Sequence, residues 1–366
     1  MLPSDMVMSL QQWPDIVRRA RDLVMQHGWN ATSYQIVNPG MRHWFSANGD
    51  AVVGFVPYAG IRVIAGAPVC DPSRLADVVG EFETDARRSK EGVVYFGSEA
   101  RLERTLPDSP SHSRALLGAQ PAWNPADWEG LLQSHASLRA QLRRAMHKGV
   151  TIEEISPDEA AQSPELRAVL EQWLRGRGLP PLHFLVEPDT LQRLDDRRTF
   201  VARLDTMQGS PVIAFAVLSP IPARNGCLVE QFPRLPDAPN GTIELLLSSA
   251  VRSIAKSGAT YVSLGLAPLA RRSQFDTAHE PRWLASLLSF AASHGRRFYN
   301  FQGLEAFKTK FRPQVWEPVY AIEAGHRFTP RALYAIAGAF ASRSPLGLIA
   351  EAAGNAIRER REAIKS

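Results

Sequence analysis

The sequence predicts an α/β protein built from two copies of one unit. The order strand meander, turn, helix, strand occurs twice along the chain. Its 366 residues also exceed what one hydrophobic core usually organises. The composition, with 45% hydrophobic and 22% charged residues, is that of an ordinary globular protein. Two α/β units therefore fit the length better than one large domain.

The first copy opens with a predicted meander of strands. Residues 44–69 alternate apolar β-formers with Asn-Gly and Ala-Gly turn signals. Apolar residues then recur at helical spacing over 75–82, after an Asp-Pro-Ser start. The run VVYFGS at 93–98 is typical of a buried strand. We assign residues 1–125 to this copy.

The second copy repeats that order. Residues 199–233 predict strands joined by a Gly-Ser turn and by an Asn-Gly turn, the latter typical of a hairpin. The run PDAPNGT predicts a turn, residues 243–258 a helix, and residues 259–268 a strand. We assign residues 151–328 to this copy.

Further helices are predicted around these units. Residues 126–150 carry an apolar stripe at helical spacing and predict a long connecting helix, and two more helices are predicted near 163–178 and 280–295. Residues 329–366 predict amphipathic C-terminal helices, too interrupted by polar residues and proline to span a bilayer as one helix. These helices could lie on an anionic membrane surface or pack on their own domain.

The charge balance is mildly basic. A formal net charge of +5 suggests an anionic partner such as phosphate, nucleic acid or a lipid headgroup, although an arginine-rich surface alone also explains it. Cys70 and Cys227, the two cysteines, lack the spacing of a zinc site or a disulfide framework, so no metal is expected. No secretory signal is recognisable. We expect a cytoplasmic protein, with peripheral contact at the inner membrane face left open.

The turn before residue 243 is the first candidate binding site. Gly241 tolerates a positive φ and a close backbone approach, and Thr242 is the predicted N-cap of the following helix. Together with Asn240, such a helix start offers backbone N–H groups to a phosphate or an oxyanion. Many α/β proteins begin helices in this way without any ligand.

Two charged residues lie at the end of the apolar strand that leads into this turn. Glu230 could orient or deprotonate an amine, and Arg234 could bind a phosphate or ester oxygen. An ordinary surface ion pair is the alternative. A predicted loop further upstream carries Arg175, His183 and Glu187.

Basic residues also lie among aromatic ones near the end of the second copy. Lys308, Lys310 and Arg312 suit a phosphodiester or the terminal adenosine of a tRNA, whereas the aromatic residues around them fit a core. Arg139, Arg143 and His147 share one face of the connecting helix, as either an anion-binding stripe or a solvated surface. The chain has no GxSxG, Walker or Rossmann motif.

The strand–turn–helix–strand order of the second copy is similar to that of GNAT acyltransferases. In those enzymes the two strands separate to form an acyl channel. The usual Arg/Gln-x-x-Gly-x-Gly/Ala pattern is absent, so the order does not by itself identify coenzyme A as the donor.

Several motifs together resemble the soluble C-terminal domain of the lysyl-phosphatidylglycerol synthases, the multiple peptide resistance factor family. They are the runs FSANGDAVVGFVPYAGIRVIAGAPV, DAPNGTIELLL, VSLGLAPLA and GLEAFKTKFRPQVWEPVYAI, within roughly residues 35–325. The resemblance implies tandem GNAT (acyl-CoA N-acyltransferase-like) domains, each a mixed, mainly antiparallel sheet flanked by helices.

The resemblance also implies transfer of an aminoacyl group from charged tRNA to phosphatidylglycerol at the cytoplasmic membrane face. Glu230 stands where many members have the Asp of an Asp-Leu-Met-Arg run, which is EQFPR here. Lys308 and Lys310 fall in the family's Lys-x-Lys pair. Full-length members carry a many-helix membrane domain ahead of this region, which we do not expect in this chain.

We therefore expect a transferase that uses aminoacyl-tRNA as co-substrate and a lipid as acceptor, without a bound cofactor. Glu230 and Arg234 are the expected catalytic residues. The expected substrate-binding residues are Asn240, Gly241, Thr242, Lys308, Lys310 and Arg312. Two alternatives stay open: an acyl-coenzyme A-dependent N-acyltransferase, and a non-catalytic module that binds lipid or RNA. The oligomeric state is not predicted.

Overall fold

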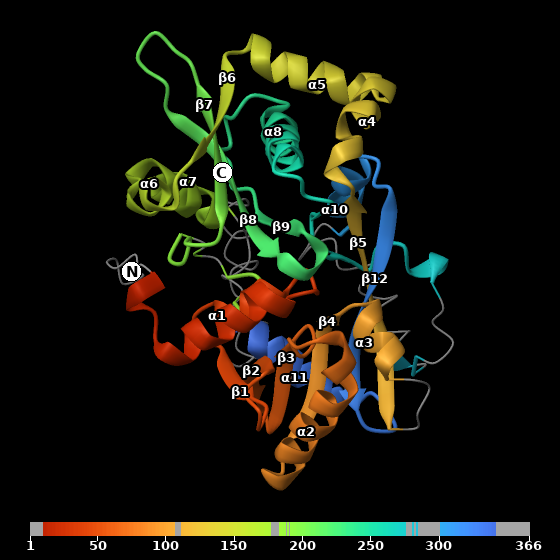
Figure 1. The fold of residues 1–366 in the computed structure, drawn as a ribbon. Coiled ribbons are helices and arrows are strands. Elements are labelled where there is room, and N and C mark those ends of the chain that lie inside the picture. The colour runs from red at the N-terminus through yellow and green to blue at the C-terminus, as the bar shows by residue number, and fades with distance from the viewer. Residues whose placement is uncertain are drawn as a thin grey trace, which may run out of the picture.

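A computed structural model describes residues 10–106, 111–176, 183–187, 189, 191–275, 280–281, 283–284 and 301–341. Most of the predicted helix at 280–295 and the last part of 329–366 therefore lie outside the described residues. Within them the chain forms one mixed, mainly antiparallel sheet with helices on both sides (Figure 1). This is the architecture that the sequence predicts for each copy.

The elements of the first copy occupy the lower part of the molecule in Figure 1. They are α1 (Asp15–His27), β1 (Arg42–Phe45), β2 (Val52–Tyr58), β3 (Ile61–Ala65), α2 (Leu75–Arg88), β4 (Gly92–Ser98), α3 (Ala100–Thr105) and β5 (His112–Trp123). As predicted, the helix α2 lies between the meander and the strand at 93–98, and the structure shows that it connects two parallel strands, β3 and β4.

The elements of the second copy form most of the upper part. They are β6 (Val150–Ile155), α6 (Pro157–Gln162), α7 (Pro164–Arg175), β7 (Arg198–Leu204), β8 (Val212–Ile221), β9 (Gly226–Gln231), α8 (Thr242–Lys256), β10 (Tyr261–Ser263), β11 (Ala267–Pro268), α10 (Phe301–Thr309) and β12 (Val315–Ala324). Here α8 connects the parallel strands β9 and β10. The predicted connecting segment holds α4 (Trp128–Ser134) and α5 (Ala136–His147), and the predicted C-terminal segment holds α11 (Pro330–Ala341).

The last strand of each predicted copy lies among the strands of the other copy. The strand order is β1-β2-β3-β4-β12-β5-β10-β9-β8-β7-β6, so β12 pairs with β4 and β5 pairs with β10. A register shift between Val319 and Tyr320 interrupts the long pairing of β12 with β5. The two copies therefore share one continuous sheet, and their boundary along the chain stays a prediction.

The predicted connecting helix is divided into two. The backbone of His135 has φ −117° and ψ 81°, which ends α4 and starts α5. The break is held on both sides, because the His135 ring bonds the carbonyl of Lys310 at 3.0 Å and the Arg139 guanidinium donates to the carbonyl of Leu132 at 2.7 Å. Arg139 is thus directed toward the end of α4.

Helix α11 packs on the protein's own core. Its alanines at 332, 335 and 339 are buried, and a Cβ on Gly338 would overlap the ring of Tyr58 in β2. Residues 330–341 therefore pack on their own domain, and the buried face of α11 is not available to a membrane. No helix among the described residues is long and apolar enough to cross a bilayer.

Candidate active site

The parallel strands β9 and β10 separate in the second copy. They pair only over Gly226–Leu228 and Tyr261–Ser263, whereas β9 continues to Gln231. After Ser263 the chain turns away, and β11 pairs with β5 instead. In the first copy, by contrast, the Gly66 amide donates to the carbonyl of Phe96 at 2.7 Å, which keeps the strands joined beyond their pairing. Among the described residues, only the second copy offers a strand separation of the GNAT type.

Glu230 lies on the open part of β9, at a β-bulge. Gln231 pairs with Val217 and Val229 with Leu218, so Glu230 is the extra residue between two pairs. Bulges often occur next to active sites, because they redirect a side chain without ending the strand. The sequence placed Glu230 at a strand end, and the structure adds the bulge.

The partner of Glu230 is Arg197 rather than Arg234. The Arg197 Nε donates to Glu230 Oε1 at 2.7 Å and its second nitrogen to Oε2 at 3.3 Å. Both side chains are less than 10% exposed. The guanidinium of Arg197 also donates to Asn38 Oδ1 at 2.9 Å and lies 4.7 Å from the ring centre of Tyr34. Arg234 lies after the end of β9, forms an isolated β-bridge with Ala214 of β8 and is exposed.

The Asp196 carboxylate, next to Arg197 in the chain, binds two residues of the first copy. Tyr34 donates its hydroxyl to Asp196 at 2.7 Å, and Arg21 binds the same carboxylate at 2.8 Å. Burial would raise the pKa of Asp196, but the hydrogen bonds from Arg21 and Tyr34 hold it below its ordinary value. Glu230 is thus fixed by residues from both copies.

The start of α8 is less accessible than the sequence suggests. Asn240 is exposed, but Thr242 is buried and donates its hydroxyl to the carbonyl of Pro239 at 2.6 Å. Gly241, with φ +96°, is the N-cap residue in place of the predicted Thr242. The reason is that α5 packs directly over this turn, and a Cβ on Gly241 would overlap the carbonyl oxygen of Gln141.

Replacing Gly241 by Ala is expected to lower the free energy of unfolding by about 3 kcal/mol. The reason is that alanine disfavours the positive φ and its Cβ would overlap the carbonyl oxygen of Gln141. The matched control is Gly258→Ala, with φ +80° and open space around the added Cβ. That variant should lose only about 1 kcal/mol. Urea unfolding of both variants checks this, and equal losses would show that α5 does not confine the turn.

Lys308 is enclosed by the chain that follows β10. Its ammonium donates to the carbonyls of Leu264, Gly265 and Leu266 at 2.8, 2.8 and 2.9 Å. Burial lowers the pKa of Lys308 to about 7. Because three carbonyls match the three N–H groups of an ammonium, the lysine holds the separated end of β10 in place.

The other two predicted cations lie nearby in sequence but point elsewhere. Lys310 forms an ion pair with Glu244, in the first turn of α8, at 2.7 Å. Arg312 follows α10 with a positive φ of 45° and is exposed. Lys308 thus binds the segment after β10, Lys310 binds the first turn of α8, and Arg312 lies at the surface.

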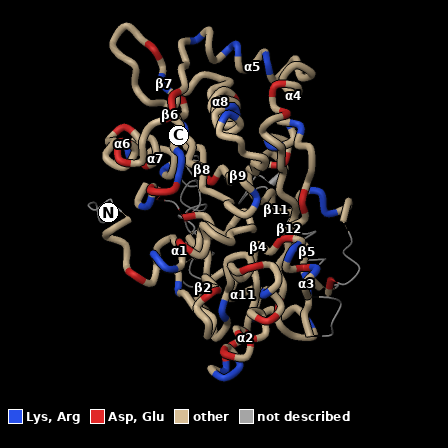
Figure 2. Tube along the Cα trace, viewed as in Figure 1, with Lys and Arg blue, Asp and Glu red and all other residues tan. Residues whose placement is uncertain are grey.

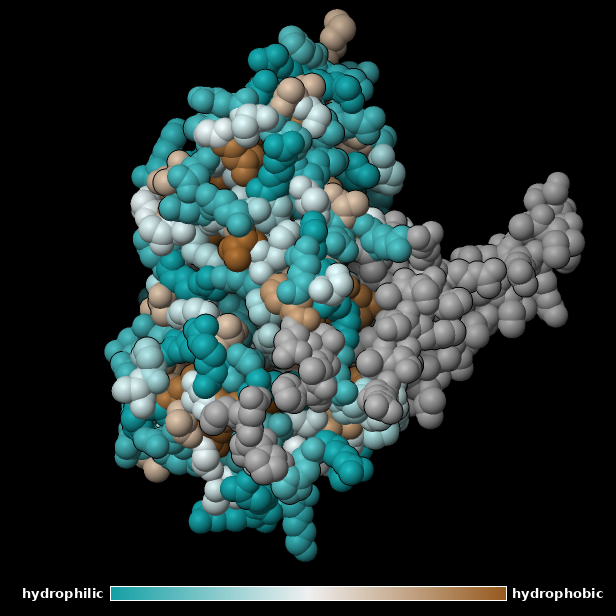
Figure 3. All heavy atoms as spheres, turned by 90° about the vertical axis from the view of Figure 1, so that its right-hand side faces the viewer, coloured by the Kyte–Doolittle hydropathy of each residue, from teal (hydrophilic) through white to brown (hydrophobic). Residues whose placement is uncertain are grey.

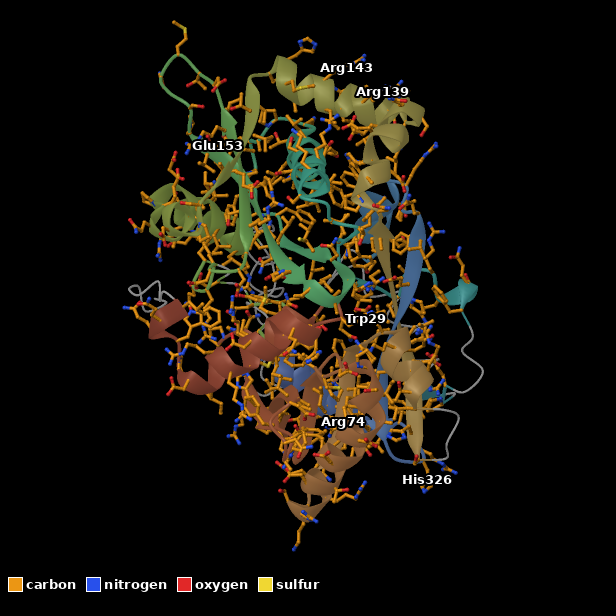
Figure 4. All side chains as sticks on the ribbon, viewed as in Figure 1. Trp29, Arg74, Arg139, Arg143, Glu153 and His326 are labelled. Atoms are coloured by element: carbon orange, nitrogen blue, oxygen red, sulfur yellow. The ribbon has the colours of Figure 1, made fainter. Side chains whose placement is uncertain are left out.

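A polar cluster that the sequence did not reveal lies at the opposite end of β9. Arg224 donates to Glu317 at 3.0 Å and to Glu99 at 3.2 Å, with its guanidinium 3.5 Å from the ring centre of Tyr261. Trp29 lies 4.6 Å from the same guanidinium, where the two halves meet (Figure 4). The Asn-Gly hairpin signal predicted this turn but not the carboxylates, which come from β12 and the end of β4.

This cluster should make stability depend on pH through Glu99. Burial raises the pKa of Glu99 to about 7, against the attraction of Arg224. Between its ordinary value of 4.5 and about 7 the folded protein therefore binds more protons than the unfolded one, and stability falls as pH rises. The contribution is up to about 1.4 kcal/mol per pH unit. Urea unfolding at several pH values should show this slope in the wild type and lose it in Glu99→Gln. Equal slopes would contradict the assignment.

An open cleft lies between β2, α11 and the loop that carries His183 and Glu187. Its volume is about 410 Å³, and Tyr58, His183, Phe184, Glu187 and Gln192 contribute to its walls. Gln231 donates its side-chain amide to the carbonyl of Glu187, which connects the cleft to β9.

The surface of α5 is basic. Arg143, Arg144, His147 and Lys148 are exposed, whereas Arg139 is only partly so. Figure 2 shows Lys and Arg along this helix, and Figure 4 shows Arg143 directed outward at the top of the molecule. On the face in Figure 3, hydrophilic residues dominate and the apolar residues form small separate groups.

Separated parallel strands, a bulge and a helix crossover define a GNAT-like α/β fold of the acyltransferase type. The model of the family "Phosphatidylglycerol lysyltransferase, C-terminal" matches residues 21–323. The chain therefore belongs to this family, which confirms the resemblance read from the motifs.

Individual relatives agree with the family assignment. The phosphatidylglycerol lysyltransferase of Bacillus subtilis is 25% identical over 81% of this chain and 33% of its own length. The LysX lysylphosphatidylglycerol biosynthesis bifunctional protein of Mycolicibacterium gilvum is 26% identical over 78% of this chain and 26% of its own length. The chain thus spans about a third or less of these relatives.

Solved structures show the same fold. The C-terminal domain (DUF2156) of a proposed lysylphosphatidylglycerol synthetase from Agrobacterium fabrum has a TM-score of 0.74 at 25% identity, over 91% of this chain and 98% of that one. L-PGS from Bacillus licheniformis has a TM-score of 0.73 at 21% identity, over 89% and 97%. FemX, with a TM-score of 0.54 at 10% identity, covers 90% of this chain.

Proposed function

We propose that this chain transfers an aminoacyl group to the glycerol hydroxyl of phosphatidylglycerol. The observation that carries the proposal is the family match over residues 21–323, which spans both copies and includes the separated strands. The names of the relatives supply the acceptor, phosphatidylglycerol, and lysine as the first group to test. An anionic lipid acceptor implies contact with the cytoplasmic face of a membrane.

We propose aminoacyl-tRNA as the donor. The exposed cations of α5 and the net charge of +5 favour a polyanionic partner. Coenzyme A fits less well, because α5 covers the turn at Gly241 where a GNAT-type donor would place its pyrophosphate. A tRNA donor binds from outside with its terminal adenosine and does not need that turn to be open.

The chemistry requires an amine-binding group, a base and support for an oxyanion. We assign Glu230 to the amino group of the aminoacyl ester, because its carboxylate is fixed at the bulge of the open strand. Lys308 would keep the end of β10 apart from β9. Lys310, Arg312 and the exposed Asn240 remain the proposed contacts to phosphate, whereas the half-buried Gly241, which α5 covers, and the buried Thr242 do not. No bound cofactor takes part in this reaction.

The test is a reconstituted assay with purified protein, lysyl-tRNA and phosphatidylglycerol vesicles. Lysyl-phosphatidylglycerol should form, and its formation should stop after RNase treatment and decrease steeply with salt. If an acylated lipid forms from a supplied acyl-coenzyme A after RNase treatment, the coenzyme A alternative is supported. Binding of vesicles or tRNA without any product would support a non-catalytic module.

A further inference from the structure

The cleft that Gln231 connects to β9 contains a histidine–carboxylate pair that the proposed function leaves unused. His183 Nδ1 lies 3.4 Å from Glu187 Oε2. The side chain of Glu187 is 11% exposed, whereas that of His183 is 36% exposed. Both residues line the cleft, and the histidine is the more accessible of the two.

The pair is held by several elements. The backbone N–H of His183 donates to the carbonyl of Phe340 at 2.8 Å, which ties this turn to α11. Glu187 Oε1 accepts the backbone N–H of Asp189 at 3.5 Å. Gln231 binds the carbonyl of Glu187 from β9. The ring is thus fixed relative to the strand that carries Glu230.

The cleft and the Arg197–Glu230 pair are connected through two residues next to them in the chain. Asn38, which binds Arg197, directly precedes Pro39 in the cleft wall. Gln231, which binds Glu187, directly follows Glu230. A substrate whose amino group meets Glu230 would therefore have its reacting carbonyl near the cleft.

We propose that His183 is the general base of the transfer reaction and that Glu187 is its positioning residue. With Nδ1–H donated to Glu187, the lone pair of Nε2 is directed away from the carboxylate. Among the described residues, Nε2 has no protein hydrogen-bond partner. The cleft of about 410 Å³ would hold the glycerol end of the lipid headgroup. This inference rests on the proposed function.

The step balances without a further reactant. The glycerol hydroxyl oxygen attacks the ester carbonyl carbon while Nε2 of His183 takes the hydroxyl proton. The tetrahedral intermediate then collapses, and the bond from the carbonyl carbon to the ribose oxygen breaks. The imidazolium returns the proton to that ribose oxygen. A new ester is formed, one ester is broken, and the histidine is neutral again.

Among the described residues that line the cleft, the titratable ones are Tyr58 on β2, His183 and Glu187. Helix α11 contributes only Gly338 and Ala339. Two charged groups outside the cleft wall, Asp189 and Arg193, also interact electrostatically with Glu187. Burial raises the pKa of Glu187, while His183 acts in the opposite direction.

The experiment measures lysyl transfer from lysyl-tRNA to phosphatidylglycerol vesicles by the full chain, as a function of pH. His183→Ala should lower kcat/KM by about 10²–10³-fold and remove the acidic limb of the pH–rate profile. Added imidazole should restore part of the rate. Glu187→Gln should lower kcat by at least about tenfold with little change in KM. The matched control is His326→Gln, an exposed histidine on the loop after β12 (Figure 4).

Each outcome bears on a different claim. If the wild type forms no aminoacylated lipid, the proposed function fails. If the wild type is active and His183→Ala stays within threefold of it with the acidic limb unchanged, the inference fails. A lower rate of His183→Ala could come from the missing base or from misfolding. Thermal unfolding shows whether the variant is folded, and added imidazole restores the rate of a folded protein that lacks its base but not that of a misfolded one.

Discussion

Replacing Glu230 by Gln is expected to lower aminoacyl transfer strongly and to destabilise the fold. The carboxylate accepts two hydrogen bonds from Arg197, and both side chains are buried. Gln cannot neutralise that guanidinium, and removing one partner of a buried ion pair costs about 3–5 kcal/mol. Transfer should fall by about 10²-fold or more, because the amino group of the substrate loses its anionic partner. Urea unfolding and the vesicle assay measure the two effects.

A matched double variant separates these effects. Replacing both partners of a buried ion pair by apolar residues is often neutral for stability. Arg197→Met combined with Glu230→Leu should therefore recover most of the lost stability and remain inactive. If the double variant regained activity with its stability, Glu230 would have only a structural role, and its assignment to the substrate amine would be wrong.

Replacing Lys308 by Met is the second change with a large expected effect. Three buried carbonyls lose their donors, which outweighs the relief of removing a buried amine and lowers the free energy of unfolding by about 2–4 kcal/mol. Transfer should fall with it, because residues 264–266 would no longer be held away from β9. Urea unfolding combined with the vesicle assay tests this.

The control for Lys308 is Lys310→Met. Lys310 is 33% exposed and has a single carboxylate partner, so its loss should cost about 1 kcal/mol. If the two variants were equally stable, the three carbonyl contacts of Lys308 would contribute nothing beyond an ordinary ion pair.

The sequence predicted the order of the elements along the chain, but not which strands pair with one another across the two copies. The Asn-Gly turn, the apolar period of α8 and the buried strand at 93–98 are local signals, and each element forms where it was expected. The exchange of β5 and β12 between the copies was not predictable, because alternation identifies a strand and one buried face but not its neighbour. The break at His135 depends on Lys310, a contact over 175 residues.

In the candidate active site, too, single residues were predictable and their long-range contacts were not. Glu230 was singled out because a charged residue ended an apolar strand, and its position on β9 was predicted correctly. Its partner Arg197 is 33 residues away, and Tyr34 comes from the other copy, so neither contact has a local signal. His183 and Glu187 were noted only as polar residues of a loop. Their pairing required the fold.

The central claim is that this chain modifies phosphatidylglycerol. The most direct measurement is mass spectrometry of lipids extracted from a host that contains phosphatidylglycerol, with and without this protein, beside the Glu230→Gln variant. We expect phosphatidylglycerol with the added mass of one aminoacyl residue in the presence of the wild type, and not with the variant. An unchanged lipidome in a host that expresses the folded wild-type chain would contradict the claim.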